Sequence, residues 1–198
     1  RVGGHTRAGY FGGGFSLGGY RNTLTGEINR SALDVDFKWY SKLFIAGRSR
    51  MRQFSTLNHT YGWNRGEGDG SLLMLTSECG PRSLKYYASG ENRTVLNTEP
   101  VLFTPGHPVA FRVTRFAFAD FSLIGPHNNI FHNDFYTTFG IGVRLKNERL
   151  IFNTIQIRLG FAVGPSGLVR SRIVRFNTQS KLEPYRFTPG IPYHVSYF

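Results

Sequence analysis

The chain has one cysteine, Cys79, among its 198 residues. A lone cysteine forms no internal disulfide, and it leaves no cysteine set for a zinc site. We expect Cys79 to be a free thiol that is buried beneath its loop. His127 and His132 share another loop, but their spacing matches no common ligand pattern, so we expect no metal and no other cofactor.

Long apolar runs are also missing. No window as long as the roughly 18 residues of a membrane-spanning helix is free of polar residues, which excludes such a helix. A spanning β-barrel is not excluded, because its strands alternate in polarity. The chain opens on Arg1 without a charged-then-apolar leader. This start predicts a removed signal peptide or a longer parent chain.

Acidic residues are scarce. There are 12 Asp and Glu against 24 Lys and Arg, giving a net charge of +12 and a pI near 10.3. Such a charge predicts an anionic partner. Nucleic acid is not expected, because the sequence has no recognition helix and no RNP-like aromatic motif. The alternatives are a basic, water-filled barrel lumen, on which Arg48, Arg50 and Arg52 share one strand face, or a rim that meets lipopolysaccharide.

Motifs of catalysis are missing as well. No serine lies in a G-x-S-x-G elbow, and no triad set is recognisable. The glycine run "GGGFSLGG" lacks the strand-turn-helix context of a phosphate-binding loop. We therefore expect that the protein is not an enzyme.

The sequence does contain 18 Phe, 10 Tyr and 24 Gly, a mixture that favours strands joined by tight turns. Segments such as "YTTFGIGVRL" and "IFNTIQIRLGF" alternate apolar and polar residues over about the 9–11 residues of a tilted membrane-spanning strand. The expected lipid-facing side chains are Ile141, Val143, Ile155, Ile157 and Leu159, and the expected inward-facing ones are Arg144, Gln156 and Arg158.

Most of the expected strands are longer than the roughly 5–6 residues of a typical strand in a soluble sandwich. They run over residues 2–24, 31–44, 48–64, 93–103, 110–125, 135–146, 150–163 and 193–198. "KNER" at 146–149 predicts a tight turn, whereas residues 65–93 form a long loop. Tight turns at one end and long loops at the other are typical of an outer-membrane barrel. The sequence therefore predicts an all-β, transmembrane antiparallel β-barrel, with a soluble sandwich as the alternative.

Several motifs occur in an order that resembles a known family. They are "SALDVDFKWYSKLFIAGRSRMRQFSTLNHTYGW", "SLKYYASGENRTVLNTEPVLF", "FAFADFSLIG", "FGIGVRLKN" and "IQIRLGF". The second is similar to a loop and strand written L-R-G-Y, a spacer and L-N-x-E, and the third to F-x-D-x-G. The fourth is similar to G-x-G-h-R-h, with Gly140, Gly142 and Arg144. Over most of residues 28–163 the chain resembles the C-terminal barrel half of the bacterial surface antigen family, which includes BamA-type and TamA-type assembly factors and two-partner secretion transporters.

The resemblance implies that loop 65–93 folds into the barrel lumen. There its basic residue meets acidic residues on the two following strands. On this chain the resemblance assigns Lys85 as the basic group, with Glu99 and Asp120 as its acceptors. The loop residues packed against the barrel wall would be Leu84, Tyr86 and Tyr87. Two departures stand out: Lys85 replaces an arginine, and Tyr86 replaces a glycine.

By the same resemblance, residues 1–198 form one outer-membrane barrel domain with about eight strands, as part of a larger barrel. A complete small barrel is the structural alternative. The last strand would border a lateral seam formed by Gly190, Pro192, Tyr193 and Phe198. Proline donates no hydrogen bond to a ladder, so this strand is expected to pair weakly.

The function implied by the resemblance is assembly or insertion of other outer-membrane proteins, or translocation of secreted ones, in the outer membrane of a Gram-negative bacterium. The expected partners are outer-membrane lipid, lipopolysaccharide, and client or partner envelope proteins. The alternative is a non-catalytic structural or interaction barrel within a larger envelope complex. The departures at Lys85 and Tyr86 favour that alternative, as do His194 and Ser196, at alternate C-terminal positions that the family usually fills with apolar residues.

Overall fold

The protein is all-β over the residues that the computed structural model describes. These are residues 2–21, 23, 26, 28–63, 72–76, 80–82, 88–105, 111–126, 133–147, 155–165, 167–169 and 174–177. The regular elements there are all strands. Accordingly, this part of the chain has no helix long and apolar enough to span a membrane.

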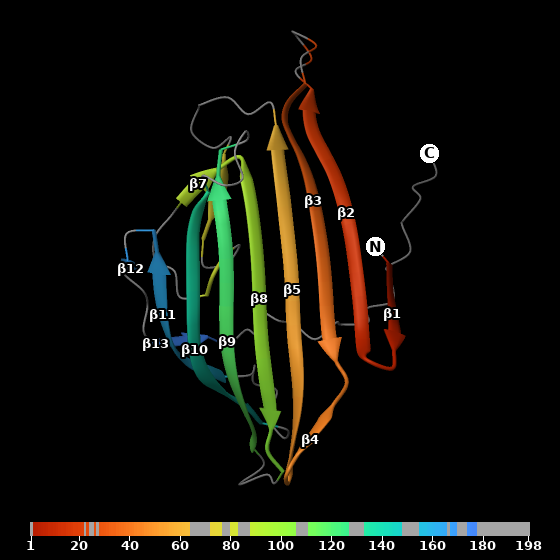
Figure 1. Ribbon diagram of the computed structural model, residues 1–198, viewed down its shortest axis with the longest axis vertical. Helices are drawn as coiled ribbons and strands as arrows, with labels where there is room; N and C mark the ends of the chain where they lie inside the picture. Colours follow the sequence, from red (N-terminus) through yellow and green to blue (C-terminus); the bar gives the residue numbers. More distant parts are fainter. Residues whose placement is uncertain are drawn as a thin grey trace, which may run out of the picture.

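One antiparallel sheet of 11 strands dominates the fold, in the order β1-β2-β3-β5-β8-β9-β10-β11-β12, with β4 beside β5 and β13 beside β11 (Figure 1). Its strands are β1 (Val2–Thr6), β2 (Gly9–Arg21), β3 (Ile28–Ser41), β4 (Phe44–Ala46), β5 (Ser49–Trp63), β8 (Asn92–Phe103), β9 (Phe111–Gly125), β10 (Asp134–Asn147), β11 (Ile155–Gly164), β12 (Gly167–Val169) and β13 (Val174–Asn177). Within the connection from β5 to β8, β6 (Leu73–Leu75) and β7 (Ala88–Gly90) form a separate two-stranded sheet.

Six of the expected strands are confirmed, and one is wrong. The long strands β3, β5, β8, β9, β10 and β11 lie where alternation predicts them. The expected strand 2–24 is instead two strands, because the chain turns tightly between Thr6 and Gly9. Gly9 has φ 138°, and a Cβ there would lie 2.1 Å from the carbonyl oxygen of Tyr40, so only glycine suits this turn. The expected strand 193–198 lies outside the described residues.

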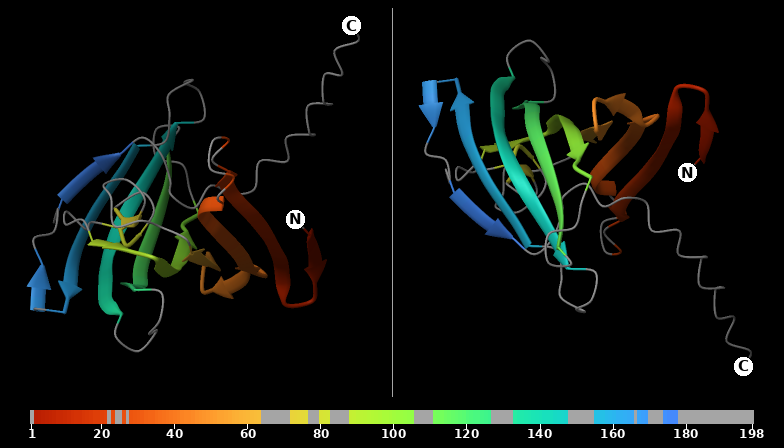
Figure 2. Two further views of the ribbon diagram at one scale, coloured as in Figure 1. Left: turned by 90° about the horizontal axis from the view of Figure 1, so that it is seen from above. Right: turned by 90° about the horizontal axis from the view of Figure 1, so that it is seen from below.

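The described strands form an open, curved sheet, not a closed barrel. β1 is one edge and β12 and β13 are at the other, and no pairing joins the two edges among the described strands. The views along the strands show the curvature, with β6 and β7 on the concave side (Figure 2). The described strands alone therefore do not close into the complete small barrel that was the structural alternative, which would also need the expected strand 193–198.

The two faces of the sheet differ as alternation predicts. On the convex, outer face Ile141 is 62% exposed, and Ile155 and Leu159 are exposed as well. On the concave, inner face Gln156 and Arg158 are buried. Because cross-strand partners lie on the same face, the register extends this division across the sheet from β2 to β11.

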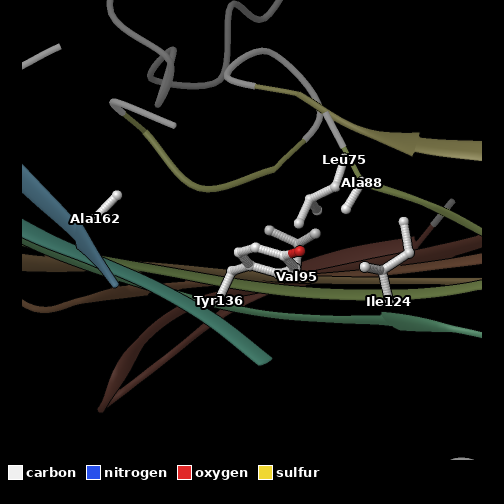
Figure 3. Close-up of a cluster of buried hydrophobic side chains, with 6 residues drawn as sticks. All are labelled: Leu75, Ala88, Val95, Ile124, Tyr136 and Ala162. Carbon is white, nitrogen blue, oxygen red and sulfur yellow. The ribbon is translucent and has the colours of Figure 1, made fainter. Parts of the chain in front are cut away.

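The core lies between the inner face and the segment that carries β6 and β7. Leu75 of β6 and Ala88 of β7 point toward Val95, Ile124 and Tyr136 on the sheet (Figure 3). Where β7 ends, a Cβ at Gly90 would lie 2.6 Å from the carbonyl oxygen of Gly125, so the segment and the sheet meet backbone to backbone. A second core cluster consists of Val101, Phe116 and Phe118, with Phe54 and Phe103 against it.

Candidate functional site

Arg82 enters the inner face and lies between two carboxylates. Its Nη2 donates to Oδ1 of Asp120 over 2.8 Å, and its backbone N–H donates to Oδ2 over 2.7 Å. Its Nη1 forms an ion pair with Glu99. The side chains of Arg82, Glu99 and Asp120 are at most 1% exposed. The loop is thus anchored on β8 and β9 by charged hydrogen bonds that water hardly reaches, and such bonds are about twice as strong as neutral ones.

Local structure explains why Arg82 reaches this position. Gly80 and Pro81 lead into it, and a Cβ at Gly80 would lie 2.6 Å from the Leu75 side chain. The chain can therefore pass close to the buried Leu75 and turn Arg82 inward. On the sheet, Thr138 is the register partner of Asp120 and donates its hydroxyl to Oδ2 over 3.1 Å.

A second arginine completes the group. Arg144 on β10 forms an ion pair with Glu99, and its Nε donates to Oε1 of Gln156 over 2.9 Å. We call Arg82, Glu99, Asp120 and Arg144 the buried ion cluster. Two guanidinium groups face two carboxylates, so the cluster is neutral when all four groups are charged. A buried charge is tolerated when it is paired and hydrogen-bonded in this way.

Two phenylalanine rings form the floor of the cluster. The guanidinium of Arg82 lies 4.7 Å from the ring centre of Phe118, and that of Arg144 lies 4.2 Å from the ring centre of Phe116. Both distances are within the range of a cation–π interaction. Phe116 and Phe118, which share the inner face with Asp120, therefore stabilise the two guanidinium groups.

The glycines of "FGIGVR" make room for these rings. A Cβ at Gly140 would lie 2.7 Å from Cζ of Phe118, and one at Gly142 would lie 2.3 Å from Cζ of Phe116. The rings lie over β10 because no side chain stands there. The glycine pattern thus has a packing role on the inner face, beside Arg144.

Burial and charge act in opposite directions on Arg82. Burial lowers the pKa of the guanidinium, whereas the carboxylates of Asp120 and Glu99 raise it. The net effect raises the pKa above the ordinary value of arginine. Arg82 therefore keeps its positive charge and acts in the cluster as a structural and electrostatic anchor.

The structure brings the two acceptors expected from sequence, Glu99 and Asp120, onto one cation, and that cation is Arg82. The other expected loop residues, Leu84, Lys85, Tyr86 and Tyr87, lie outside the described residues, as do Gly190, Pro192, Tyr193 and Phe198 of the expected seam. Arg82 was not predicted from the sequence. The sequence did contain a signal for Arg82. The L-R-G-Y pattern has an arginine followed by a small residue, and "PRSL" keeps both features. In "LKYY" a lysine and a tyrosine replace them.

The sequence also contains a lone cysteine and two histidines that share a loop. Cys79, His127 and His132 lie outside the described residues. Within the described part of the chain, no group of three or more His, Cys, Asp or Glu side chains is placed to hold a metal ion.

No protein-family model matches the sequence, and no curated protein or solved structure shows significant similarity to it. The class of the protein therefore follows from its fold and its site alone. It is an antiparallel β-sheet protein with an exposed apolar outer face and an inner face on which a loop is anchored by the buried ion cluster.

The glycine pattern yields a direct test. Changing Gly140 to alanine should reduce the free energy of unfolding by about 1–3 kcal/mol, because an added methyl group overpacks the inner face. The new Cβ would lie 2.0 Å from the carbonyl oxygen of Leu159, a backbone atom that cannot move aside cheaply. Urea unfolding measures the change. The control is Gly18→Ala, where nothing lies within 4 Å, and equal losses in both variants would contradict the packing role.

Proposed function

We propose that the chain is part of an outer-membrane barrel that inserts other outer-membrane proteins or translocates secreted ones. The observation that carries this proposal is the anchoring of the loop by Arg82 on Glu99 and Asp120. It supports the resemblance to the surface antigen family, which led us to expect a basic loop residue on these two acceptors. The residue differs from the expected Lys85, but the arrangement is the same.

The outer face provides independent support for a membrane location. Large apolar side chains are exposed there on several neighbouring strands. They include Leu57, Leu96, Phe121, Phe135, Phe139, Ile141, Ile155, Leu159 and Phe161. Soluble proteins rarely expose an apolar surface of this extent, and such surfaces mark contact with membrane or protein. Outer-membrane lipid and lipopolysaccharide are the proposed surroundings.

The open sheet suggests how the protein would act. An unpaired strand edge offers backbone N–H and C=O groups that can pair with another chain. A client strand would add to such an edge by β-augmentation, which involves no bond-making chemistry. The partners in this proposal are client proteins of the envelope.

A non-catalytic interaction barrel within a larger envelope complex is the second candidate. The observation that favours it is the occupied inner face. Leu75 and Arg82 are both at most 1% exposed and fill this face over β8 and β9, which opposes a wide water-filled passage there. In this role the barrel would bind stable partners and have no client proteins.

Membrane insertion can be measured first. The refolded chain should float with lipid vesicles in a density gradient and resist extraction with urea. Ile141→Arg should weaken insertion by about 2–4 kcal/mol, the cost of a cation on the lipid face at mid-depth. Ser89→Arg, an exposed position in β7, is the control and should leave insertion unchanged. Recovery of all three proteins in the soluble fraction would refute a membrane location.

The two candidates differ in a cellular test. Depleting the full gene product in its own bacterium should lower the amounts of several unrelated outer-membrane barrels if the protein inserts clients. Unchanged amounts, together with a constant set of co-purified envelope proteins, would favour the interaction barrel and contradict the proposed function.

A further inference from the structure

A basic cleft is lined by residues from the start of β5, the end of β8 and the start of β9, which lie at the lower end of the sheet in Figure 1. Its volume is about 530 Å³. Four arginines, Arg48, Arg50, Arg52 and Arg112, line it together with apolar residues that include Leu43 and Phe103. None of these residues belongs to the buried ion cluster, so the cleft is a separate feature.

Basic side chains dominate the lining of this cleft. Among the residues that the structure describes, no aspartate or glutamate lines it. Nε of Arg52 and Oγ1 of Thr104, two polar atoms of its lining, are buried without a hydrogen-bond partner. Gathering the like charges of Arg48, Arg50 and Arg52 costs electrostatic free energy, and buried polar atoms without partners cost more. A bound anion would relieve both costs, so the cleft has the character of an anion site.

The spacing of the arginines indicates the shape of the anion. Arg50 and Arg52 are alternate residues of β5, so they lie on one face about 7 Å apart along the strand. Arg50 pairs with Phe103, and Phe103 pairs with Thr114, two residues from Arg112. Arg112 therefore lies two strands away and two residues along, about 12 Å from Arg50. A single phosphoryl group is too small to meet all these cations, whereas an extended peptide repeats its side chains on one side every ~7 Å.

We propose that this cleft binds an extended acidic segment of another protein, with carboxylates at alternate positions on Arg50 and Arg52. Leu43 and Phe103 accept apolar side chains of the same segment. The partner is a protein and not a lipid, because Arg50 and Arg52 lie on the inner face, opposite the exposed apolar face. The cleft adds to the proposed function the acidic character of the partner. The proposed binding rests on that function only for the statement that the partner is an envelope protein.

The binding test needs no membrane. The full chain in detergent micelles is titrated into a fluorescein-labelled peptide of alternating glutamate and leucine, and fluorescence anisotropy is recorded. The R50Q/R52Q variant should bind at least about tenfold more weakly, because it loses two charge-assisted hydrogen-bonding groups. Raising the salt concentration should weaken binding to the unchanged protein. A peptide with glutamine for glutamate should bind as weakly as the variant binds the acidic one.

The matched control is Arg115→Gln. Arg115 is an exposed arginine of β9 on the outer face, as its pairing with Val143 shows, and its loss should leave the affinity unchanged. Arg48→Gln, in the exposed turn before β5, should weaken binding even if the double variant does not fold.

Three results would overturn the inference. The first is equal affinity of the unchanged protein and R50Q/R52Q, with both folded by circular dichroism. The second is saturable binding of pyrophosphate without binding of the peptide, which would define a phosphate site. The third is binding of phosphatidylglycerol vesicles that depends on Arg50 and Arg52, which would define a lipid site. A chain that binds the peptide but does not float with vesicles refutes the membrane location alone.

Discussion

Changing Arg82 to methionine should release the loop from the inner face and lower the free energy of unfolding by about 3–5 kcal/mol. The loss is this large because Glu99 and Asp120 are fully buried and would remain as uncompensated charges. Methionine roughly keeps the volume over Phe118, so the charge is the main change. Urea unfolding in detergent measures the free energy, and limited proteolysis within residues 64–87 reports release of the loop.

Two further substitutions show whether the charge or the guanidinium geometry matters. Arg82→Lys keeps the charge but loses the bidentate fork on Asp120, so it should cost less than Arg82→Met and more than zero. Arg82→Met combined with Asp120→Leu should recover part of the lost stability, because one unpaired charge is removed with its partner. Arg115→Met, at an exposed arginine outside the buried ion cluster, is the control and should not lower the free energy of unfolding. An Arg82→Met loss no larger than that of Arg115→Met would contradict the anchoring role.

Lys85 provides the internal comparison, because the resemblance assigned the anchoring role to it. With Arg82 already on both carboxylates, Lys85→Ala should lower stability by much less than Arg82→Met. If Lys85→Ala lowered the free energy of unfolding as much as Arg82→Met does, the anchoring residue would be Lys85.

Changing Leu75 to alanine should undock the β6–β7 hairpin at a cost of about 2–5 kcal/mol. Leu75 is 0% exposed and fills the space above Val95, Ile124 and Tyr136, so its truncation loses apolar burial and leaves a cavity. The buried ion cluster remains intact in this variant. Protease should therefore cleave near β6 and β7 before it cleaves near Arg82. The free energy of unfolding and the order of the cleavage sites are the measurements.

Met74→Ala is the matched control for Leu75. Met74 is the preceding residue of β6, lies on the opposite face and is 52% exposed. Its truncation should cost well under the Leu75 value, since exposed side chains bury little apolar surface. Equal effects at the two positions would mean that the hairpin is not docked through Leu75.

Much of the sheet was predictable, because strand pairing in a two-faced sheet follows alternation. In β10 and β11 the apolar residues recur at every second position, so residue type alone assigns the outer and inner faces. Two features could not be predicted in this way. The turn before Gly9 depends on a close backbone approach to Tyr40, and β4 pairs with the start of β5 over only three residues, too short for a periodic signal.

The candidate site was predictable only in part. Glu99 and Asp120 interrupt apolar strands, so each stands out as an inward-facing carboxylate. Among the basic residues of the loop, Arg82 and Lys85 lie only three positions apart, and a loop has no periodicity that selects between them. The small residue after Arg82 is the signal in the sequence that favours it, whereas Lys85 is followed by two tyrosines.

The sequence by itself determined the class of fold and the character of its two faces, because both depend on residue type at alternate positions. The tertiary structure decided that Arg82 is buried between Glu99 and Asp120, that two arginines share Glu99, and that the described strands form an open sheet. The physical reason is that a buried charge requires all its partners at hydrogen-bonding distance at once. The residues that meet at Arg82 come from a loop and several strands, and only the folded chain brings them together.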